Sequence, residues 1–147
     1  EELNNNKYID YELINSLKYC KENGLKTKIF TNGMLPEMVK KICDMELCDA
    51  WSVDYKGISN NIAPYIGVKA DKYLKNIKKT LICIIKNKLP LEIRTTFFEG
   101  NEKDRELIKK RMIHLEQGVF KIYPDYPYFR YIEQEDMREN YKELNID

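Results

Sequence analysis

The sequence predicts an α/β protein with a mostly parallel sheet, and two observations lead to this fold class. Short apolar stretches alternate along the chain with longer stretches of helical spacing, which is the pattern of successive strands and crossover helices. The short stretches end in polar tripeptides: Thr31-Asn32-Gly33, Asp54-Tyr55-Lys56 and Arg94-Thr95-Thr96. Because the carboxyl ends of parallel strands meet at one edge of a sheet, we expect these tripeptides to build a shared polar site.

The first elements follow from apolar spacing and from capping residues. Residues 8–23 are expected to form a helix that Asp10 caps and that Gly24 ends in a left-handed turn. A short strand over residues 28–31 and a second helix over residues 36–45 come next. This order, helix before strand, leaves one edge of the sheet uncovered, so we expect a piece of a longer protein and self-association through the open edge.

The middle of the chain repeats the alternation. A second strand is expected over residues 50–54 and a third over residues 91–97, since both are short and apolar. Residues 71–87 have the apolar stripe of a helix, and residues 57–69, broken by glycine and proline, are expected to form a long loop.

The last third is expected to hold a fourth helix over residues 101–116, a turn at Gly118 and a fourth strand over residues 119–123. The aromatic residues that follow indicate an irregular flap or a surface for a partner. We therefore divide the chain into a sheet-forming part, residues 1–123, and an aromatic-rich tail, residues 124–147.

Composition narrows the classes of function. The chain has 147 residues, enough for one domain, and its 25 basic against 24 acidic residues give no electrostatic reason to bind nucleic acid. No apolar run approaches the roughly 20 residues that span a bilayer, and the chain starts with polar residues, so a cytoplasmic protein without a membrane segment is expected.

The cysteines and the histidine give no catalytic or metal site. Cys43 and Cys48 are spaced too widely for the usual zinc hairpin, while Cys20 and Cys83 fall on apolar faces of expected helices. All four are expected to be small core residues without structural disulfides. His114 has no plausible nucleophilic partner, so no catalytic residue and no metal ligand is predicted.

The polar residues at the strand ends have a functional and a structural interpretation. Asp54 and Lys56 alternate and so point to the same side, where they can bind a zwitterion or a ribose, or simply pair with each other. Arg94 can clamp a carboxylate in two-pronged fashion, or it can pair with Glu92 or Glu99.

These motifs, in this order, resemble those of the radical S-adenosylmethionine enzymes, above all the activating enzymes of pyruvate formate-lyase and of anaerobic ribonucleotide reductase. The likeness covers about residues 8–100. It runs through these segments: Gly24-Leu25-Lys26, Thr31-Asn32-Gly33, Leu35-Pro36-Glu37, Asp54-Tyr55-Lys56, Tyr65-Ile66-Gly67-Val68, Asn76-Ile77-Lys78-Lys79 and Arg94-Thr95-Thr96.

The resemblance implies a fold, a cofactor and a set of binding residues. The fold is a partial (β/α) barrel, open on one side, which binds S-adenosylmethionine at its mouth. Thr31 and Asn32 would line that site, Asp54 and Lys56 would touch the ribose and the amino-acid part, and Arg94 would meet the cofactor carboxylate.

The chain also departs from this family. The loop Cys-x-x-x-Cys-x-x-Cys, which binds a [4Fe-4S] cluster, is absent, as is the Gly-Gly-Glu-Pro segment, and Phe30 stands where an acid often precedes Thr-Asn-Gly. The resemblance thus implies the C-terminal part of an enzyme that reductively cleaves S-adenosylmethionine, inactive alone. The partner that receives the glycyl radical would be a glycyl-radical enzyme or an anaerobic ribonucleotide reductase.

Two other functions remain open. The chain can be a cluster-free module that binds a nucleotide or an amino acid through Asp54, Lys56 and Arg94. It can also be an interaction or scaffold domain that docks through the aromatic residues 123–131.

Overall fold

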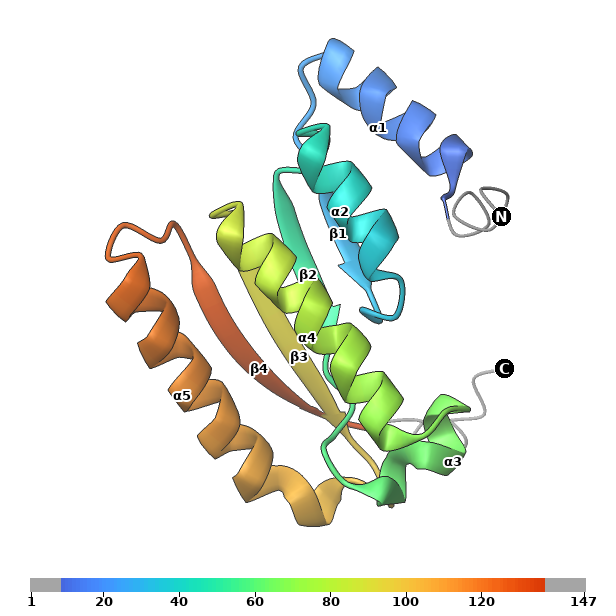
Figure 1. Ribbon diagram of the computed structural model, residues 1–147, viewed down its shortest axis with the longest axis vertical. Helices are drawn as coiled ribbons and strands as arrows, with labels where there is room; N and C mark the ends of the chain where they lie inside the picture. The colour runs from blue at the N-terminus through green and yellow to red at the C-terminus, as the bar shows by residue number, and fades with distance from the viewer. Residues whose placement is uncertain (1–8, 137–147) are drawn as a thin grey trace, which may run out of the picture.

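The strands form one sheet of four, and every neighbouring pair is parallel. The computed structural model describes residues 9–136, and the strand order in the sheet equals the order along the chain (Figure 1). The strands are β1 (Lys28–Thr31), β2 (Ala50–Asp54), β3 (Leu91–Phe97) and β4 (Phe129–Glu135). The predicted α/β class with a parallel sheet is confirmed, while its membership in a partial barrel stays a prediction.

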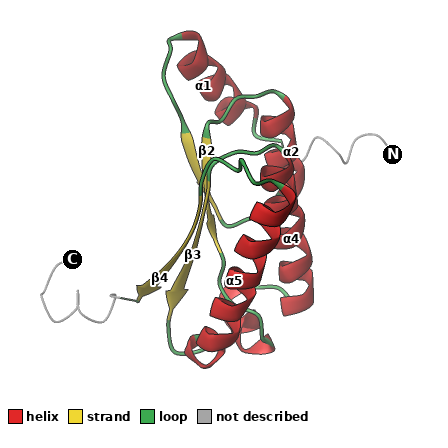
Figure 2. Ribbon diagram, turned by 90° about the vertical axis from the view of Figure 1, so that its left-hand side faces the viewer, coloured by secondary structure: helices red, strands yellow, loops and turns green. Residues whose placement is uncertain are grey.

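Helices alternate with the strands and cover one face of the sheet. Figure 2, viewed along the sheet, shows the long helices on one side and the opposite face bare. The helices are α1 (Tyr11–Glu22), α2 (Pro36–Asp44), α4 (Ala70–Lys86) and α5 (Arg105–Ile122), with the short α3 (Ala63–Ile66) before α4. None of the helices within residues 9–136 is long and apolar enough to cross a membrane.

The alternation along β3 shows how the two faces differ. Leu91, Ile93 and Phe97 are buried and lie on the helix-covered face, where they join the core. Glu92 and Arg94 alternate with them and therefore lie on the bare face. The sheet is thus apolar toward the helices and charged on the other side.

Most of the first hundred residues fold as the sequence predicts. The first three strands have the predicted bounds, and α1, α2 and α4 differ from the predicted helices by a few residues at their ends. Asp10 caps α1 by accepting a hydrogen bond from the Leu13 amide at 3.0 Å, and Gly24 takes the left-handed conformation with φ +72°. The expected start of the first helix at residue 8 lies outside the described residues.

Two predictions of secondary structure are wrong. The segment 57–69 is not all loop, because it contains a 3₁₀ turn, η3 (Asn60–Ile62), and α3. Residues 119–123 form no strand, because α5 continues through Gly118 to Ile122 and buries Val119 on the same face as its earlier core residues. Glycine at 118 and the β-branched and aromatic residues after it favour a turn and a strand locally, but packing against the sheet favours the helix.

The fourth strand comes instead from the segment expected to be a tail. β4 pairs with β3 along its whole length, from Leu91 opposite Phe129 to Phe97 opposite Glu135. Its start is fixed by Tyr126, which is buried and donates a hydrogen bond to the Leu89 carbonyl at 2.5 Å. The division of the chain at residue 123 stays a prediction about domains, although residues 129–135 clearly belong to the same sheet.

The two glycines 118 and 24 test this assignment of α5. A β-carbon added to either would have no other atom within 4 Å, but Gly118 is helical and Gly24 has φ +72°. We expect Gly118→Ala to raise the free energy of unfolding by about 0.5–1 kcal/mol, because alanine is the better helix former. Gly24→Ala is the control and should lower it by about 1 kcal/mol. Urea unfolding measures both, and a loss of stability in Gly118→Ala would contradict a helix at this position.

Candidate functional site

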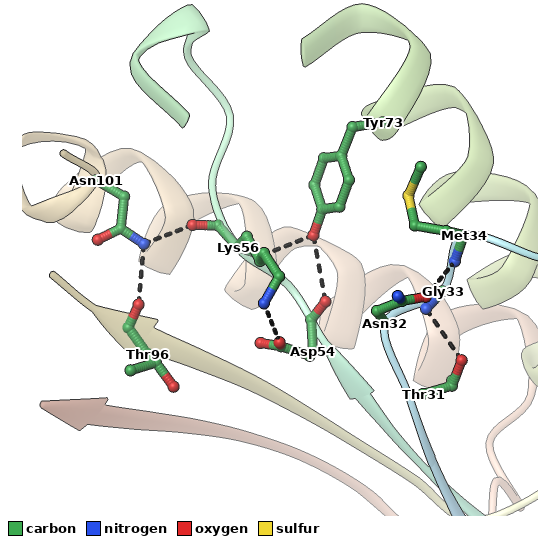
Figure 3. A network of polar contacts seen from close by, with 9 residues as sticks. All are labelled: Thr31, Asn32, Gly33, Met34, Asp54, Lys56, Tyr73, Thr96 and Asn101. Atoms are coloured by element: carbon green, nitrogen blue, oxygen red, sulfur yellow. Dashed lines mark hydrogen bonds and ion pairs between the residues drawn. The ribbon is translucent and has the colours of Figure 1, made fainter. Parts of the chain in front are cut away.

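The carboxyl ends of β2 and β3 bring the predicted charged residues together. Asp54 and Arg94 are direct register partners on the two neighbouring parallel strands, so both side chains lie on the bare face of the sheet. Lys56 lies two residues beyond Asp54, and its Nζ contacts Asp54 Oδ2 at 2.5 Å (Figure 3). One carboxylate, one ammonium and one guanidinium therefore share a single edge of the sheet.

Asp54 and Lys56 face a hollow with two aromatic neighbours. Its volume is about 280 Å³, and it is lined also by Tyr65, Phe98 and Thr96, together with Asp136. The rings of Tyr65 and Phe98 lie with centroids 4.6 Å apart. The side chains of Asp54 and Lys56 are 31% and 34% exposed, so a ligand in the hollow can reach both. Hydroxyl groups and a flat ring are the ligand features that such a lining accommodates.

Arg94 lies against an aromatic ring and a carboxylate. Its guanidinium carbon is 4.7 Å from the centre of the Phe30 ring, and its Nε is 3.8 Å from Glu92 Oε1. Among residues 9–136, the buried Nε has no hydrogen-bond partner. The predicted pairing with Glu92 is thus present only as a loose ion pair, and the guanidinium can still accept an anion on the bare face.

Glu92 holds several groups of this face together. Its Oε1 accepts a hydrogen bond from the buried Ser52 hydroxyl at 3.1 Å, and its Oε2 lies 3.4 Å from Lys28 Nζ. Lys28 in turn lies 5.1 Å from the Phe30 ring centre, so this ring has cations on it from both Lys28 and Arg94. Phe30 therefore supplies an aromatic surface that attracts cations.

Thr31 and Asn32 shape the loop after β1 rather than facing Asp54. The Thr31 hydroxyl accepts a hydrogen bond from the Gly33 amide at 3.1 Å, and the Asn32 side chain accepts one from the Met34 amide at 3.0 Å (Figure 3). Thr31 pairs in register with Val53, which belongs to the helix-covered face. In the structure these two side chains serve the turn, and their contact with a cofactor stays a prediction.

The turn itself is locked to α4. Gly33 has φ +74°, and a methyl group on it would come within 3.0 Å of Ile77 Cγ1. The buried Thr80 hydroxyl donates a hydrogen bond to the Gly33 carbonyl at 2.8 Å. Glycine is therefore needed here both for the backbone angle and for the close approach of the helix.

Tyr73 and Asn101, which the sequence analysis does not single out, fix the backbone of the site. The Tyr73 hydroxyl accepts a hydrogen bond from the Lys56 amide at 2.7 Å and lies 3.2 Å from the Asp54 carbonyl, to which it donates. The Asn101 amide group donates to the carbonyls of Lys56 at 2.5 Å and Thr96 at 2.9 Å (Figure 3). These contacts tie the loops after β2 and β3 to each other and to α4.

The described residues offer no ligand set for an iron–sulfur cluster. Within residues 9–136, no group of three or more His, Cys, Asp or Glu side chains could hold a metal ion. Cys43 and Cys48 are buried, and Cys20 and Cys83 are half-buried on α1 and α4. Cys43, Cys48 and Cys83 belong to or pack against the core, whereas Cys20 does not join it, so that part of the prediction is wrong. The described residues do not fit a [4Fe-4S] cluster.

One comparison with known proteins agrees with the sequence resemblance. The chain is 32% identical, over 104 residues, to a protein of Methanocaldococcus jannaschii that is named as a glycyl-radical enzyme activating enzyme. The aligned stretch covers 67% of this chain and 42% of that relative, so the chain spans less than half of the relative's length. No family model and no solved structure matches the chain.

The Asn101 clamp yields a test of stability. Asn101 is fully buried, and Asn101→Ala leaves two carbonyls and the Phe98 amide, which now donates to Asn101 Oδ1 at 2.9 Å, without partners. We expect the free energy of unfolding to fall by about 2–3 kcal/mol. Asn87→Ala is the matched control, since its amide bonds the Cys83 carbonyl at the exposed end of α4, and it should cost less than about 1 kcal/mol. If chemical unfolding gave equal losses of stability for Asn101→Ala and Asn87→Ala, the hydrogen bonds of Asn101 would not be unusually important.

Ionisation of Tyr73 is expected to lower the free energy of unfolding at alkaline pH. Burial raises the pKa of Tyr73 above its ordinary value in spite of the hydrogen bond from the Lys56 amide. Because the folded pKa lies above the unfolded value of about 10, its contribution is complete below pH 10 and is lost as pH rises. Tyr73→Phe should therefore lose less stability than the parent between about pH 10 and 11, although it is less stable at pH 7. Urea unfolding of the two proteins at about pH 10 and pH 11 measures these losses of stability. Equal losses in the parent and in Tyr73→Phe would contradict the prediction.

Proposed function

We propose that the chain forms part of a radical S-adenosylmethionine activating enzyme and carries one half of its cofactor site. The observation that carries this proposal is the register pairing of Asp54 with Arg94, which puts a carboxylate and a guanidinium beside Lys56 at one edge of the sheet. The similarity to an archaeal protein named as an activating enzyme supports the same conclusion.

Each residue has a role that suits its chemistry. Asp54 accepts hydrogen bonds from the ribose hydroxyls, and Lys56 keeps the charge of Asp54 balanced while it donates to the ligand. Arg94 binds the carboxylate of the amino-acid part, because its planar guanidinium matches the geometry of a carboxylate and Phe30 and Glu92 hold it in place. Thr31 and Asn32 order the loop after β1 through their hydrogen bonds with the Gly33 and Met34 amides, and in the complete site this loop would adjoin the cofactor.

The complete protein would use this site for radical chemistry. In the family that the chain resembles, a [4Fe-4S] cluster would supply the electron that cleaves S-adenosylmethionine, and its cysteine ligands would have to come from outside these 147 residues. The partner would be a glycyl-radical enzyme or an anaerobic ribonucleotide reductase, which receives the radical on a glycine. The residues of this chain bind and orient the cofactor, and the 147 residues alone are expected to be inactive.

A second function is suggested by the way residues of this chain alone hold the site in place. The backbone around Asp54 and Lys56 is fixed by Tyr73 and Asn101 from within the chain, so the hollow is formed without a further segment. A cluster-free module that binds a nucleotide or an amino acid would need no more than this. An interaction domain that uses residues 123–131 has less support, since Tyr126 and Phe129 of that segment are buried.

Calorimetric titration of the 147-residue chain tests the half-site directly. We expect S-adenosylmethionine to bind with a dissociation constant below about 1 mM and Arg94→Ala to weaken binding at least tenfold, because it removes a charge-assisted contact. Arg130→Ala is the matched control, an exposed arginine that pairs in register with Glu92 farther from the carboxyl edge, and it should bind as the parent does.

The choice of ligand separates the two functions. Adenosine and methionine are titrated separately under the same conditions. Preference for the intact cofactor over both parts supports the radical enzyme, whereas equal binding of adenosine or methionine alone supports the cluster-free module. A folded chain that binds none of the three would overturn both proposals for these residues.

A further inference from the structure

The helix layer has an open groove on the side away from the proposed cofactor site. α2 packs closely along α4, whereas α5 stands apart from α4. Between α4 and α5 lies a groove with a volume of about 430 Å³. Residues of both helices line it, and Figure 1 shows α4 and α5 in the same layer over the sheet.

The floor of the groove is apolar and continuous. The α4 wall supplies Leu74, Ile77, Leu81, Ile82 and Ile85, whose spacing follows one stripe of a helix. From Leu74 to Ile85 this stripe extends for roughly 16 Å at the helical rise of about 1.5 Å per residue. On the α5 wall, Met112 and Leu115 face it. Ile82 is 41% exposed, a large share for an isoleucine beside so many apolar neighbours.

Basic residues predominate on the two helices that line the groove. Every charged residue of α4 from 72 to 86 is a lysine, after Asp71 in the first turn, and every charged residue of α5 from 107 to 115 is a lysine or an arginine, between Glu106 and Glu116. The whole chain, in contrast, has 25 basic and 24 acidic residues. Lys78 and Arg111 lie directly in the lining. An apolar floor with basic walls is therefore concentrated on these two helices.

We propose that this groove docks an amphipathic helix of a partner protein whose apolar stripe is flanked by acidic residues. Such a helix would complete the helical layer over the sheet, in the way that helix-in-groove complexes form, while its carboxylates meet the basic walls. A membrane is a less suitable partner, because a flat surface would not reach the recessed floor of the groove. Nucleic acid is also less suitable, because its binding rests on phosphate charge and does not require an apolar floor.

The floor also joins the groove to the proposed cofactor site, although the docking does not depend on that site's function. Tyr55 lies between Asp54 and Lys56 in the sequence, but its buried side chain points into the groove. Its hydroxyl accepts a hydrogen bond from Arg111 Nη1 at 3.1 Å. A helix in the groove would contact these residues from the face opposite to the hollow.

Fluorescence anisotropy with defined peptides tests the proposal on the intact chain. The probe is a labelled synthetic 18-residue helix with leucines on one face and glutamates on its flanks. A matched peptide keeps the leucines and replaces every glutamate by lysine. We expect the acidic peptide to bind at least tenfold more tightly than the basic one, and we expect its affinity to fall as the salt concentration rises.

Variants of the chain locate the binding. Ile82→Glu should weaken the acidic peptide at least tenfold, because it puts a carboxylate into the apolar floor. Ile113→Glu is the matched control: this isoleucine of α5 is 47% exposed and lies on the other side of the helix, outside the groove. Lys78→Glu, an exposed change that leaves the floor intact, should also weaken binding, and thermal melts monitored by circular dichroism confirm that each variant folds.

Five results would overturn the proposal, of which four concern the peptides and the chain itself. They are equal affinity for the two peptides, no binding of the acidic peptide, binding that Ile82→Glu leaves unchanged in a folded protein, and a dimer of the chain that Ile82→Glu dissolves in analytical ultracentrifugation. Such a dimer would show that the groove binds a second copy of this chain. Binding to vesicles of phosphatidylserine without binding to the acidic peptide would likewise assign it to a membrane surface.

Discussion

The site depends most on one constraint, the need to satisfy the backbone groups that leave β2 and β3 at the same edge of the sheet. Past Asp54 and Arg94, β2 and β3 are no longer paired with each other, so the carbonyls of Lys56 and Thr96 do not bond across these two strands. An unsatisfied buried carbonyl is costly. The buried side-chain amide of Asn101 donates a hydrogen bond to each of these two carbonyls. The position of Lys56, and with it the ion pair with Asp54, follows from this amide.

On the bare face of the sheet, ion pairs and contacts with an aromatic ring hold the charged side chains in place. Glu92 is only 15% exposed and is balanced by Lys28, Arg94 and the Ser52 hydroxyl. Phe30 supplies a surface on which both cations lie. Because one carboxylate is shared by two cations, this face keeps an excess of positive charge around Arg94, which favours an anionic ligand.

What the sequence could predict depended on how local the determining contacts are. The bounds of β1, β2 and β3 follow from short apolar runs that end in polar residues, and the strand-end charges come together because parallel strands end at one edge. α5 could not be bounded in this way, since Gly118 and Val119 favour a turn and a strand locally, while burial of Val119 against the sheet decides for helix. Asn101 and Tyr73 gave no signal, because the hydrogen bonds that join them to Lys56 span 45 and 17 residues of the sequence.

The two proposed binding sites lie on opposite faces of the sheet, and residues 54–56 contribute to both. Strand alternation sends Asp54 to the bare face and Tyr55 to the helix-covered face, so neighbouring residues contact different surroundings. Tyr73 holds the backbone of Asp54 and Lys56 from α4, the same helix that forms one wall of the groove. A displacement of α4 would therefore move the hydroxyl that fixes both charged residues. The strand end and the groove are linked by a hydrogen-bonded path only a few residues long, which would give the proposed partner on the helices a physical route to the proposed ligand site.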